Sequence, residues 1–175
     1  MDLEKFIRTV PDFPKPGIGF KDITTLIHNG KAFKYAVDEM ADFFDPNEID
    51  LVAGAESRGF VFASALAYKW EKGNVLMRKP GKLPYKTVSE SYQLEYGTDS
   101  LHVHIDAIQK GQRVLLIDDL LATGGTMKAC CNLVEKMGGI VAGVAFVIEL
   151  DFLNGKDLFK DYKFFSSVHY DNEDI

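Results

Sequence analysis

Cysteine is scarce in this sequence, and this excludes two classes of small protein. Among 175 residues there are only two cysteines, the neighbours Cys130 and Cys131. Adjacent cysteines are poorly placed to bridge each other, and without further cysteines they cannot complete a thiolate metal site. The chain is therefore neither a disulfide scaffold nor a zinc finger, and the two thiols are typical of helix residues in a reducing compartment.

Long apolar runs and an excess of basic residues are also missing. No window approaches the roughly 18 uninterrupted apolar residues of a membrane-spanning helix, and the segment MDLEKFIRTV lacks the apolar stretch of a signal peptide. Lysine and arginine number 20 against 26 aspartates and glutamates, which gives a formal net charge of -6. These absences predict a cytoplasmic protein that binds neither membranes nor nucleic acids in general.

The length and the apolar pattern predict a single α/β domain over residues 1–175. Helices are expected at 31–44, 60–70 and 125–137, and strands at 51–55, 75–77, 100–105, 113–117 and 140–150. Nearly continuous apolar character at 114–117 and 141–148 is typical of parallel strands that are covered on both faces. We therefore expect a central, mostly parallel sheet flanked by helices.

Polar loops follow three of the expected strands. They are AESRG after 51–55, RKPGK after 75–77 and DDLLATGGT after 113–117. Ligands of open α/β sheets lie at the carboxyl ends of the strands. The three loops are therefore expected to form one site.

The stretch VLLIDDLLATGGT, at 114–126, predicts a site for a ribose phosphate. Its last five residues combine glycines, two hydroxyls and a helix N-terminus, which together favour a bound phosphate. The fingerprints of nucleoside triphosphate and dinucleotide sites, GxxxxGK[ST] and GxGxxG, are absent, so a monophosphate is indicated. Asp118 and Asp119 can accept hydrogen bonds from vicinal hydroxyls. Each feature alone could be a solvated turn or a helix cap, but together after a buried strand they indicate a binding site.

The same stretch resembles the phosphoribosyl-diphosphate signature of the type I phosphoribosyltransferases. Further segments are similar to parts of the adenine phosphoribosyltransferases of that family, namely FPKPGIGFKDIT (Phe13–Thr24), AESRGF (Ala55–Phe60), RKPGKLP (Arg78–Pro84), SYQLEYG (Ser91–Gly97) and FFSSVHYD (Phe164–Asp171). The resemblance implies the type I phosphoribosyltransferase fold, with a small N-terminal hood from residues 1–30 and a flexible lid loop.

The reaction that the resemblance implies is the conversion of adenine and 5-phosphoribosyl 1-diphosphate to AMP and diphosphate. The bond at the anomeric carbon should break ahead of bond formation, so the enzyme's main task is to hold the departing diphosphate and exclude water. Mg²⁺ is implied as the cofactor, carried by the diphosphate with no protein ligands of its own. A homodimer is implied as well.

The resemblance also assigns the sites of the sugar, its phosphate and the diphosphate. The 5-phosphate would be bound by Ala122, Thr123, Gly124, Gly125 and Thr126, and the ribose hydroxyls by Asp118 and Asp119. Ser57 and Arg58 would contact the diphosphate, and a cis peptide between Glu56 and Ser57 would aim loop N–H groups at it. Without the resemblance, Arg58 would be interpreted as a surface arginine.

Cations for the diphosphate are expected from a lid that begins at Arg78 and continues to Ser91. Arg78, Lys79 and Lys82 flank its Pro-Gly pair, although composition alone would favour an ordinary solvated loop. Beyond it, Glu95 and Tyr96 match residues that the family keeps near the base and the anomeric carbon. Glu95 could exchange a proton with the purine or oppose positive charge on the sugar. Glu95, Arg58 and Lys82 are the predicted catalytic residues.

The adenine pocket is expected from the hood segment PGIGFKD. Phe20 resembles the aromatic residue that stacks on the base, and backbone groups near Gly19 and Lys21 would read its exocyclic amine. Some relatives carry a bulkier aliphatic residue in place of Gly19 and an arginine in place of Lys21. Because lysine lacks the planar guanidinium fork, these departures bear on base selectivity.

Two other functions stay open from the sequence. One is transfer to another purine, such as xanthine, guanine or hypoxanthine, because selectivity depends on a few hydrogen bonds at the pocket edge. The other is a transcriptional regulator that senses phosphoribosyl diphosphate. Such a regulator would need a DNA-binding module, for which the chain shows neither a spare domain nor a basic recognition helix.

Overall fold

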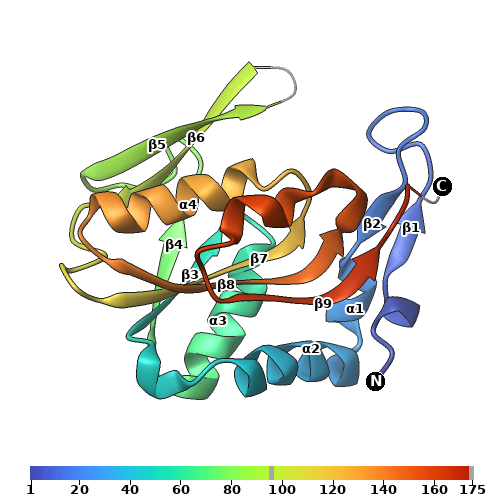
Figure 1. Ribbon diagram of the computed structural model, residues 1–175, viewed down its shortest axis with the longest axis horizontal. Helices are drawn as coiled ribbons and strands as arrows, with labels where there is room; N and C mark the ends of the chain where they lie inside the picture. The colour runs from blue at the N-terminus through green and yellow to red at the C-terminus, as the bar shows by residue number, and fades with distance from the viewer. Residues whose placement is uncertain (95–96, 174–175) are drawn as a thin grey trace.

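A computed structural model describes residues 1–94 and 97–173 and has a five-stranded parallel sheet at its centre (Figure 1). The strands are β3 (Leu51–Ala55), β4 (Gly73–Met77), β7 (Arg113–Leu121), β8 (Ile140–Leu150) and β9 (Phe164–Tyr170), in the order β4-β3-β7-β8-β9. All four pairings in this sheet are parallel. The predicted α/β class and central parallel sheet are confirmed.

Helices cover both faces of the sheet. In Figure 1, α2 (Gly30–Phe43) and α3 (Gly59–Trp70) lie on one face and α4 (Gly125–Lys136) lies on the other. The short helix α1 (Thr24–His28) and the 3-10 helices η1 (Glu4–Phe6), η2 (Pro46–Glu48), η3 (Asp151–Leu153) and η4 (Gly155–Phe159) complete the helical elements of the described residues. Alternate residues of β7 enter the two cores, which explains its unbroken apolar sequence.

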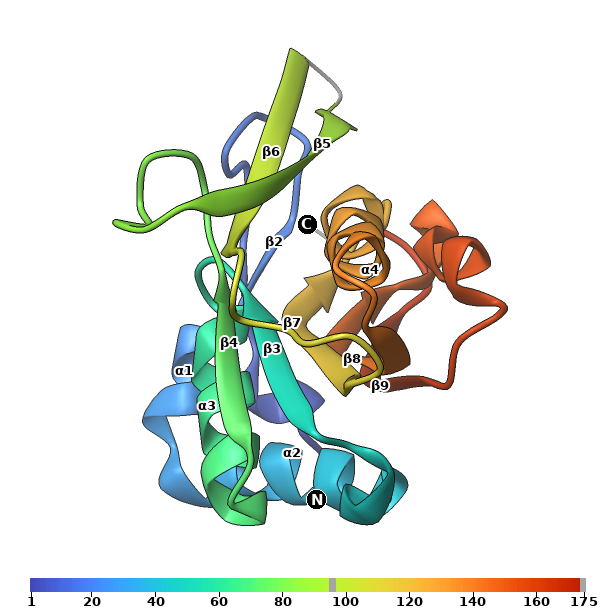
Figure 2. The same ribbon diagram turned by 90° about the vertical axis from the view of Figure 1, so that its left-hand side faces the viewer.

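Two antiparallel hairpins stand outside the central sheet. The first joins β1 (Arg8–Val10) to β2 (Phe20–Asp22), and the second joins β5 (Thr87–Leu94) to β6 (Gly97–His104). In Figure 2 the second hairpin rises above the end of the sheet, on the side of α4. The two hairpins therefore flank the edge at which the parallel strands end.

Two boundaries differ from the sequence-based expectation. Strand β7 continues to Leu121, so Asp118 and Asp119 belong to the strand and not to the loop after it. Thr87–Ser91 also lies in strand β5, which confines the expected lid to residues 78–86. The polar composition of this segment and its weak core-forming pattern predict a loop, but a surface hairpin whose alternate residues face solvent has a similar composition. Over the described ranges, no helix is long and apolar enough to cross a membrane.

Candidate active site

The junction between β7 and α4 forms the floor of a cavity of about 380 Å³. The loop Ala122–Thr126 lines it, and Gly124 is the N-cap of α4 with a φ of 87°. A Cβ at Gly124 would lie 3.1 Å from the carbonyl oxygen of Gly155, so both the positive φ and the close packing favour glycine there. The amides at the start of α4 thus border a concave, polar space that suits an anion.

Two adjacent acids reach this cavity from the end of β7. The Asp119 side chain is buried, and its carboxylate forms an ion pair with Nε of Arg58. The Asp118 carboxylate accepts the Asp119 backbone N–H at 2.9 Å. Burial raises the pKa of Asp118 above its usual range, and the neighbouring charge of Asp119 adds to the shift. The pair therefore offers several oxygen acceptors within one small space.

The loop between β3 and α3 approaches the same acids very closely. The Glu56–Ser57 peptide is cis, as expected from the resemblance. Arg58 is the N-cap of α3, and a Cβ on the next residue, Gly59, would lie 2.9 Å from Oδ1 of Asp118. The glycine lets α3 start against the end of β7, which places Arg58 beside Asp119.

Glu56 is a functional candidate that the sequence-based assignment left without a role. Its carboxylate accepts the backbone N–H of Lys79 at 2.8 Å and the Nε–H of Arg78 at 3.2 Å. Although burial opposes the shift, these two donors lower the pKa of Glu56. Glu56 lines the cavity and connects the loop after β3 to the loop after β4.

Lys79 extends from the end of β4 toward the second hairpin. Its amine donates to the Tyr92 hydroxyl at 2.8 Å and forms an ion pair with Asp99. Burial opposes a rise in the pKa of Lys79, but its contact with Asp99 raises it. Tyr92 on β5 and Asp99 on β6 are positioning candidates that no sequence motif marks, because strand pairing alone brings them together.

The cavity brings together most of the predicted sugar and phosphate residues. They are Ser57, Arg58, Lys79, Asp118, Asp119 and the loop Ala122–Thr126. Within the described part of the chain, Arg78 and Lys82 do not line this cavity, although the Arg78 guanidinium donates to the backbone oxygen of Lys82 at 3.3 Å. Glu95 and Tyr96 lie outside the described residues. Phe146 lines the cavity as well, and no sequence motif marked it, because it reaches the site only through its register with Asp118.

A second, more apolar cavity of about 400 Å³ lies beside the first hairpin. Its lining residues are Val10, Phe13, Phe20, Asp22, Thr24 and Arg58. The rings of Phe13 and Phe20 meet edge to face at 5.2 Å, and the Arg58 guanidinium carbon is 5.5 Å from the centroid of Phe20. Since Arg58 lines both cavities, the two spaces adjoin. Of the three predicted base-binding residues, Phe20 lines this cavity, whereas Gly19 and Lys21 do not.

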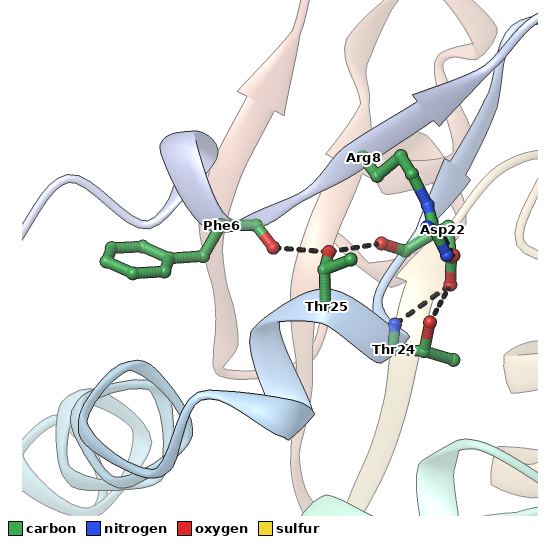
Figure 3. Close-up of polar contacts among 5 residues, drawn as sticks. All are labelled: Phe6, Arg8, Asp22, Thr24 and Thr25. Carbon is green, nitrogen blue, oxygen red and sulfur yellow. Dashed lines mark hydrogen bonds and ion pairs between the residues drawn. The ribbon is translucent and has the colours of Figure 1, made fainter.

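A polar network fixes the hairpin to the helix that follows it (Figure 3). Asp22 accepts the backbone N–H of Thr24 at 2.9 Å and pairs with Arg8 across the hairpin. The Thr25 hydroxyl donates to the backbone oxygen of Phe6 at 2.6 Å. The hairpin and α1 are thereby held as one unit beside the apolar cavity.

Two groups of oxygen donors among the described residues could hold a metal ion. Glu56, Asp118 and Asp119 line the main cavity, and such carboxylates suit a hydrated Mg²⁺ that keeps most of its waters. A separate cluster, Glu149, Asp151 and His169, has its ligand atoms within 4.8 Å of one another. Its members already contact each other, with 3.0 Å between His169 Nδ1 and Asp151 Oδ1. The oxygen donors of the cavity therefore fit the predicted metal better.

Comparisons with known proteins place these features in a family context. Residues 24–174 match the model of the phosphoribosyl transferase domain. An adenine phosphoribosyltransferase of Thermotoga petrophila is 53% identical over 170 residues, covering 97% of this chain and 100% of the relative.

Solved structures show the same similarity. The crystal structure of an adenine phosphoribosyltransferase from Thermoanaerobacter pseudethanolicus superposes with a TM-score of 0.93 at 48% identity, covering 97% of this chain and 98% of the other. A Saccharomyces cerevisiae adenine phosphoribosyltransferase, solved with an imino-altritol bisphosphate and adenine, gives a TM-score of 0.90 at 34% identity, with coverage of 95% and 96%.

Proposed function

This chain belongs to the phosphoribosyltransferase family, and we propose that it converts adenine and 5-phosphoribosyl 1-diphosphate to AMP and diphosphate. The observation that carries this proposal is the joint placement of Asp118, Asp119 and the loop Ala122–Thr126 around one cavity. More than half of the residues are identical to those of the Thermotoga petrophila adenine phosphoribosyltransferase over nearly the whole chain. The enzyme is accordingly a glycosyltransferase of purine salvage, and residues 1–175 act as one catalytic domain whose first 30 residues supply the base-binding hood.

The sugar phosphate is held at both ends. The 5-phosphate binds to the amides and hydroxyls of Ala122–Thr126, where the N-terminus of α4 adds a favourable dipole. Asp118 and Asp119 accept hydrogen bonds from the two ribose hydroxyls. Bound in this way, the sugar phosphate has its anomeric carbon between the phosphate loop and the cations of the cavity. Such positioning of the reacting carbon favours group transfer.

The diphosphate binds toward Ser57, Arg58 and Lys79. Arg58 and Lys79 bring positive charge to the cavity, and each is paired with a carboxylate. Arg78 and Lys82 join through a movement of loop 78–86. Glu56, Asp118 and Asp119 would face a Mg²⁺ ion carried by the diphosphate, and the ion would supply charge to screen the leaving group.

The chemistry exchanges one bond at the anomeric carbon for another. The bond from that carbon to the diphosphate oxygen breaks, a purine ring nitrogen forms the new bond, and the proton of that nitrogen departs. Arg58 and Lys79 stabilise the negative charge of the leaving diphosphate. Glu95 and Tyr96 follow β5 directly in the sequence, and we assign them to the base and the reacting carbon.

The base occupies the apolar cavity against Phe20. This wall is aromatic, and Arg58 at its edge connects it to the ribose acids. Backbone groups around Gly19 and Lys21 read the exocyclic amine. A base stacked on Phe20 would lie next to the Arg58 guanidinium, which borders that ring.

A homodimer in the cytoplasm is the expected working form. Leu76, Tyr85 and Ile105 are exposed apolar residues on or near β4, the edge strand of the sheet, and their burial would favour a second copy. The free thiols of Cys130 and Cys131 are both buried, which suits a reducing compartment.

The test of the function is nucleotide formation from 5-phosphoribosyl 1-diphosphate and Mg²⁺, with adenine, hypoxanthine, guanine and xanthine supplied separately. The purified protein should form product with adenine, and Glu95→Ala should form much less. Turnover of an oxopurine without turnover of adenine would show that the oxopurine is the substrate. Binding of phosphoribosyl diphosphate without turnover of any base would favour the sensor function.

A further inference from the structure

The two faces of the first hairpin have different environments. On one face, Val10 and Phe20 pair across the strands and both line the apolar cavity. On the other face, Thr9 pairs with Lys21, and Lys21 is only 4% exposed. Because side chains alternate along a strand, the Lys21 side chain points away from the cavity that Phe20 lines. The Lys21 side chain therefore lies on the face of the hairpin opposite that cavity.

The Lys21 amine lies between the hairpin and the central sheet. It donates to the Thr9 hydroxyl at 3.0 Å and sits 4.1 Å from the centroid of the Tyr170 ring. Tyr170 is the last residue of β9, pairs with Leu150 of β8 and is 8% exposed. Figure 1 shows the hairpin beside the end of β9. The Lys21 ammonium group on β2 thus contacts the aromatic face of Tyr170 on β9.

This contact is suited to fixing the hairpin in place. A buried ammonium group is costly unless polar or π partners compensate for the lost water, and a cation over an aromatic face is strongest when both are shielded from solvent. The hairpin has only three residue pairs, and a two-stranded ribbon of that size is marginal by itself. Its position relative to the sheet must therefore come from contacts such as this one.

We propose that Tyr170 is a positioning residue for the base site. By holding the Lys21 amine, Tyr170 sets the distance between β2 and the sheet and so fixes Phe20 at the wall of the apolar cavity. The inference rests on the proposed function, because it takes adenine to stack on Phe20. Tyr170 itself touches neither the base nor the sugar phosphate, whose cavities it does not line.

Replacement of the Tyr170 ring tests the proposal, because it should change the KM for adenine and leave the KM for phosphoribosyl diphosphate unchanged. Tyr170→Leu, which removes the aromatic face, should raise the KM for adenine about tenfold. The KM for phosphoribosyl diphosphate should stay at the wild-type value, because the phosphate loop and its acids are untouched. Tyr170→Phe keeps the ring and loses only the hydroxyl, so it is the matched control and should behave as wild type.

A double-mutant cycle identifies the partner through which Tyr170 acts. Lys21→Met should raise the KM for adenine like Tyr170→Leu, and the double variant should add little to either single change. Additive effects would overturn the proposal. Equal rises in both KM values, or a loss of thermal stability with the KM for adenine unchanged, would also overturn it and leave Tyr170 as an ordinary core residue.

Hydrogen exchange gives a readout that does not depend on the reaction. In Tyr170→Leu, the backbone amides of residues 8–10 and 20–22 should exchange faster, while those of β3 and β7 keep their protection. If the wild type fails to use adenine, the proposed function fails, but this comparison still decides whether Tyr170 holds the hairpin. Unchanged exchange in the hairpin would contradict the positioning role.

Discussion

Arg58 donates its Nε–H to the buried carboxylate of Asp119, a residue 61 positions away in the sequence. The same guanidinium lies over the ring of Phe20. One arginine therefore connects the acid assigned to the ribose with the aromatic wall assigned to the base. Its planar shape matters for both contacts, because lysine can neither donate through a fork nor stack as a plane.

Arg58→Lys is expected to lower kcat/KM for both substrates by about tenfold or more, since a charged hydrogen bond and a stacked contact are lost together. Steady-state kinetics with each substrate varied in turn would measure this. Arg113→Lys is the matched control, because Arg113 pairs in a similar way with Asp50 and lines neither cavity. The control should keep wild-type kinetic constants. Equal losses in both variants would contradict a specific role for Arg58.

A second prediction concerns Gly124, the N-cap of α4. Gly124→Ala adds a Cβ at a positive φ and brings it within 3.1 Å of Gly155, Leu158 and Phe159. We expect a higher KM for phosphoribosyl diphosphate and a free energy of unfolding lower by about 1–3 kcal/mol.

Gly111→Ala is the matched control for Gly124→Ala, because it introduces backbone strain without crowding at the phosphate loop. Gly111 has a φ of 84° but no heavy atom within 4 Å of an added Cβ. Its alanine variant should lose about 1–2 kcal/mol of stability while the KM for phosphoribosyl diphosphate stays unchanged. Chemical denaturation and steady-state kinetics on both variants would decide this. A Gly124→Ala enzyme with an unchanged KM would contradict the phosphate-binding assignment.

The two lysines that follow β4 are expected to act at different steps. Lys79 lines the cavity, so Lys79→Met should raise the KM for phosphoribosyl diphosphate about tenfold by removing a cation and leaving Asp99 unpaired. Lys82 does not line the cavity and can reach the diphosphate only after the loop moves. Lys82→Met should therefore lower kcat at an unchanged KM, as expected for a contact made only in the transition state. A rise in KM alone for Lys82→Met would place that amine at the ground-state complex.

The motif around β7 shows what the sequence could predict. Four apolar residues, two acids and a glycine-rich turn occur in one continuous stretch, so local patterns were enough to predict the strand, the helix and the loop between them. Sequence reasoning failed where a contact depends on strand register. Phe146 reaches the cavity because it pairs with Asp118, and Asp99 reaches Lys79 because β6 pairs with β5.

The same limit applies to the first hairpin. Residues 8–10 and 20–22 form strands that are too short for a periodic signal, and the apolar pattern predicted neither of them. Backbone groups near Lys21 are predicted to read the base, whereas alternation along β2 turns the Lys21 side chain away from the cavity of Phe20. Only the pairing of β1 with β2 decides which face each residue occupies.

The last prediction concerns the acid stability of that hairpin. The pKa of Asp22 is lowered from 3.8 to about 2 in the folded protein, first by the hydrogen bond from the Thr24 side chain and then by that from Arg8. A carboxyl group with a lowered folded pKa stabilises the fold when it is ionised. This contribution should be complete above pH 4 and should disappear as the pH falls from about 4 to about 2.

Comparison of the wild type with Asp22→Asn at several pH values measures this effect. The difference in free energy of unfolding between the two proteins should be largest at neutral pH and should shrink toward pH 2. At low pH, protonation removes the Asp22 charge from the wild type, and the variant lacks that charge at every pH. Thr24→Val deletes the hydroxyl donor to Asp22, so the folded pKa of Asp22 should rise toward 3.8 and the stability should change over a narrower pH range. A difference that stays constant with pH would show that ionised Asp22 does not stabilise the hairpin.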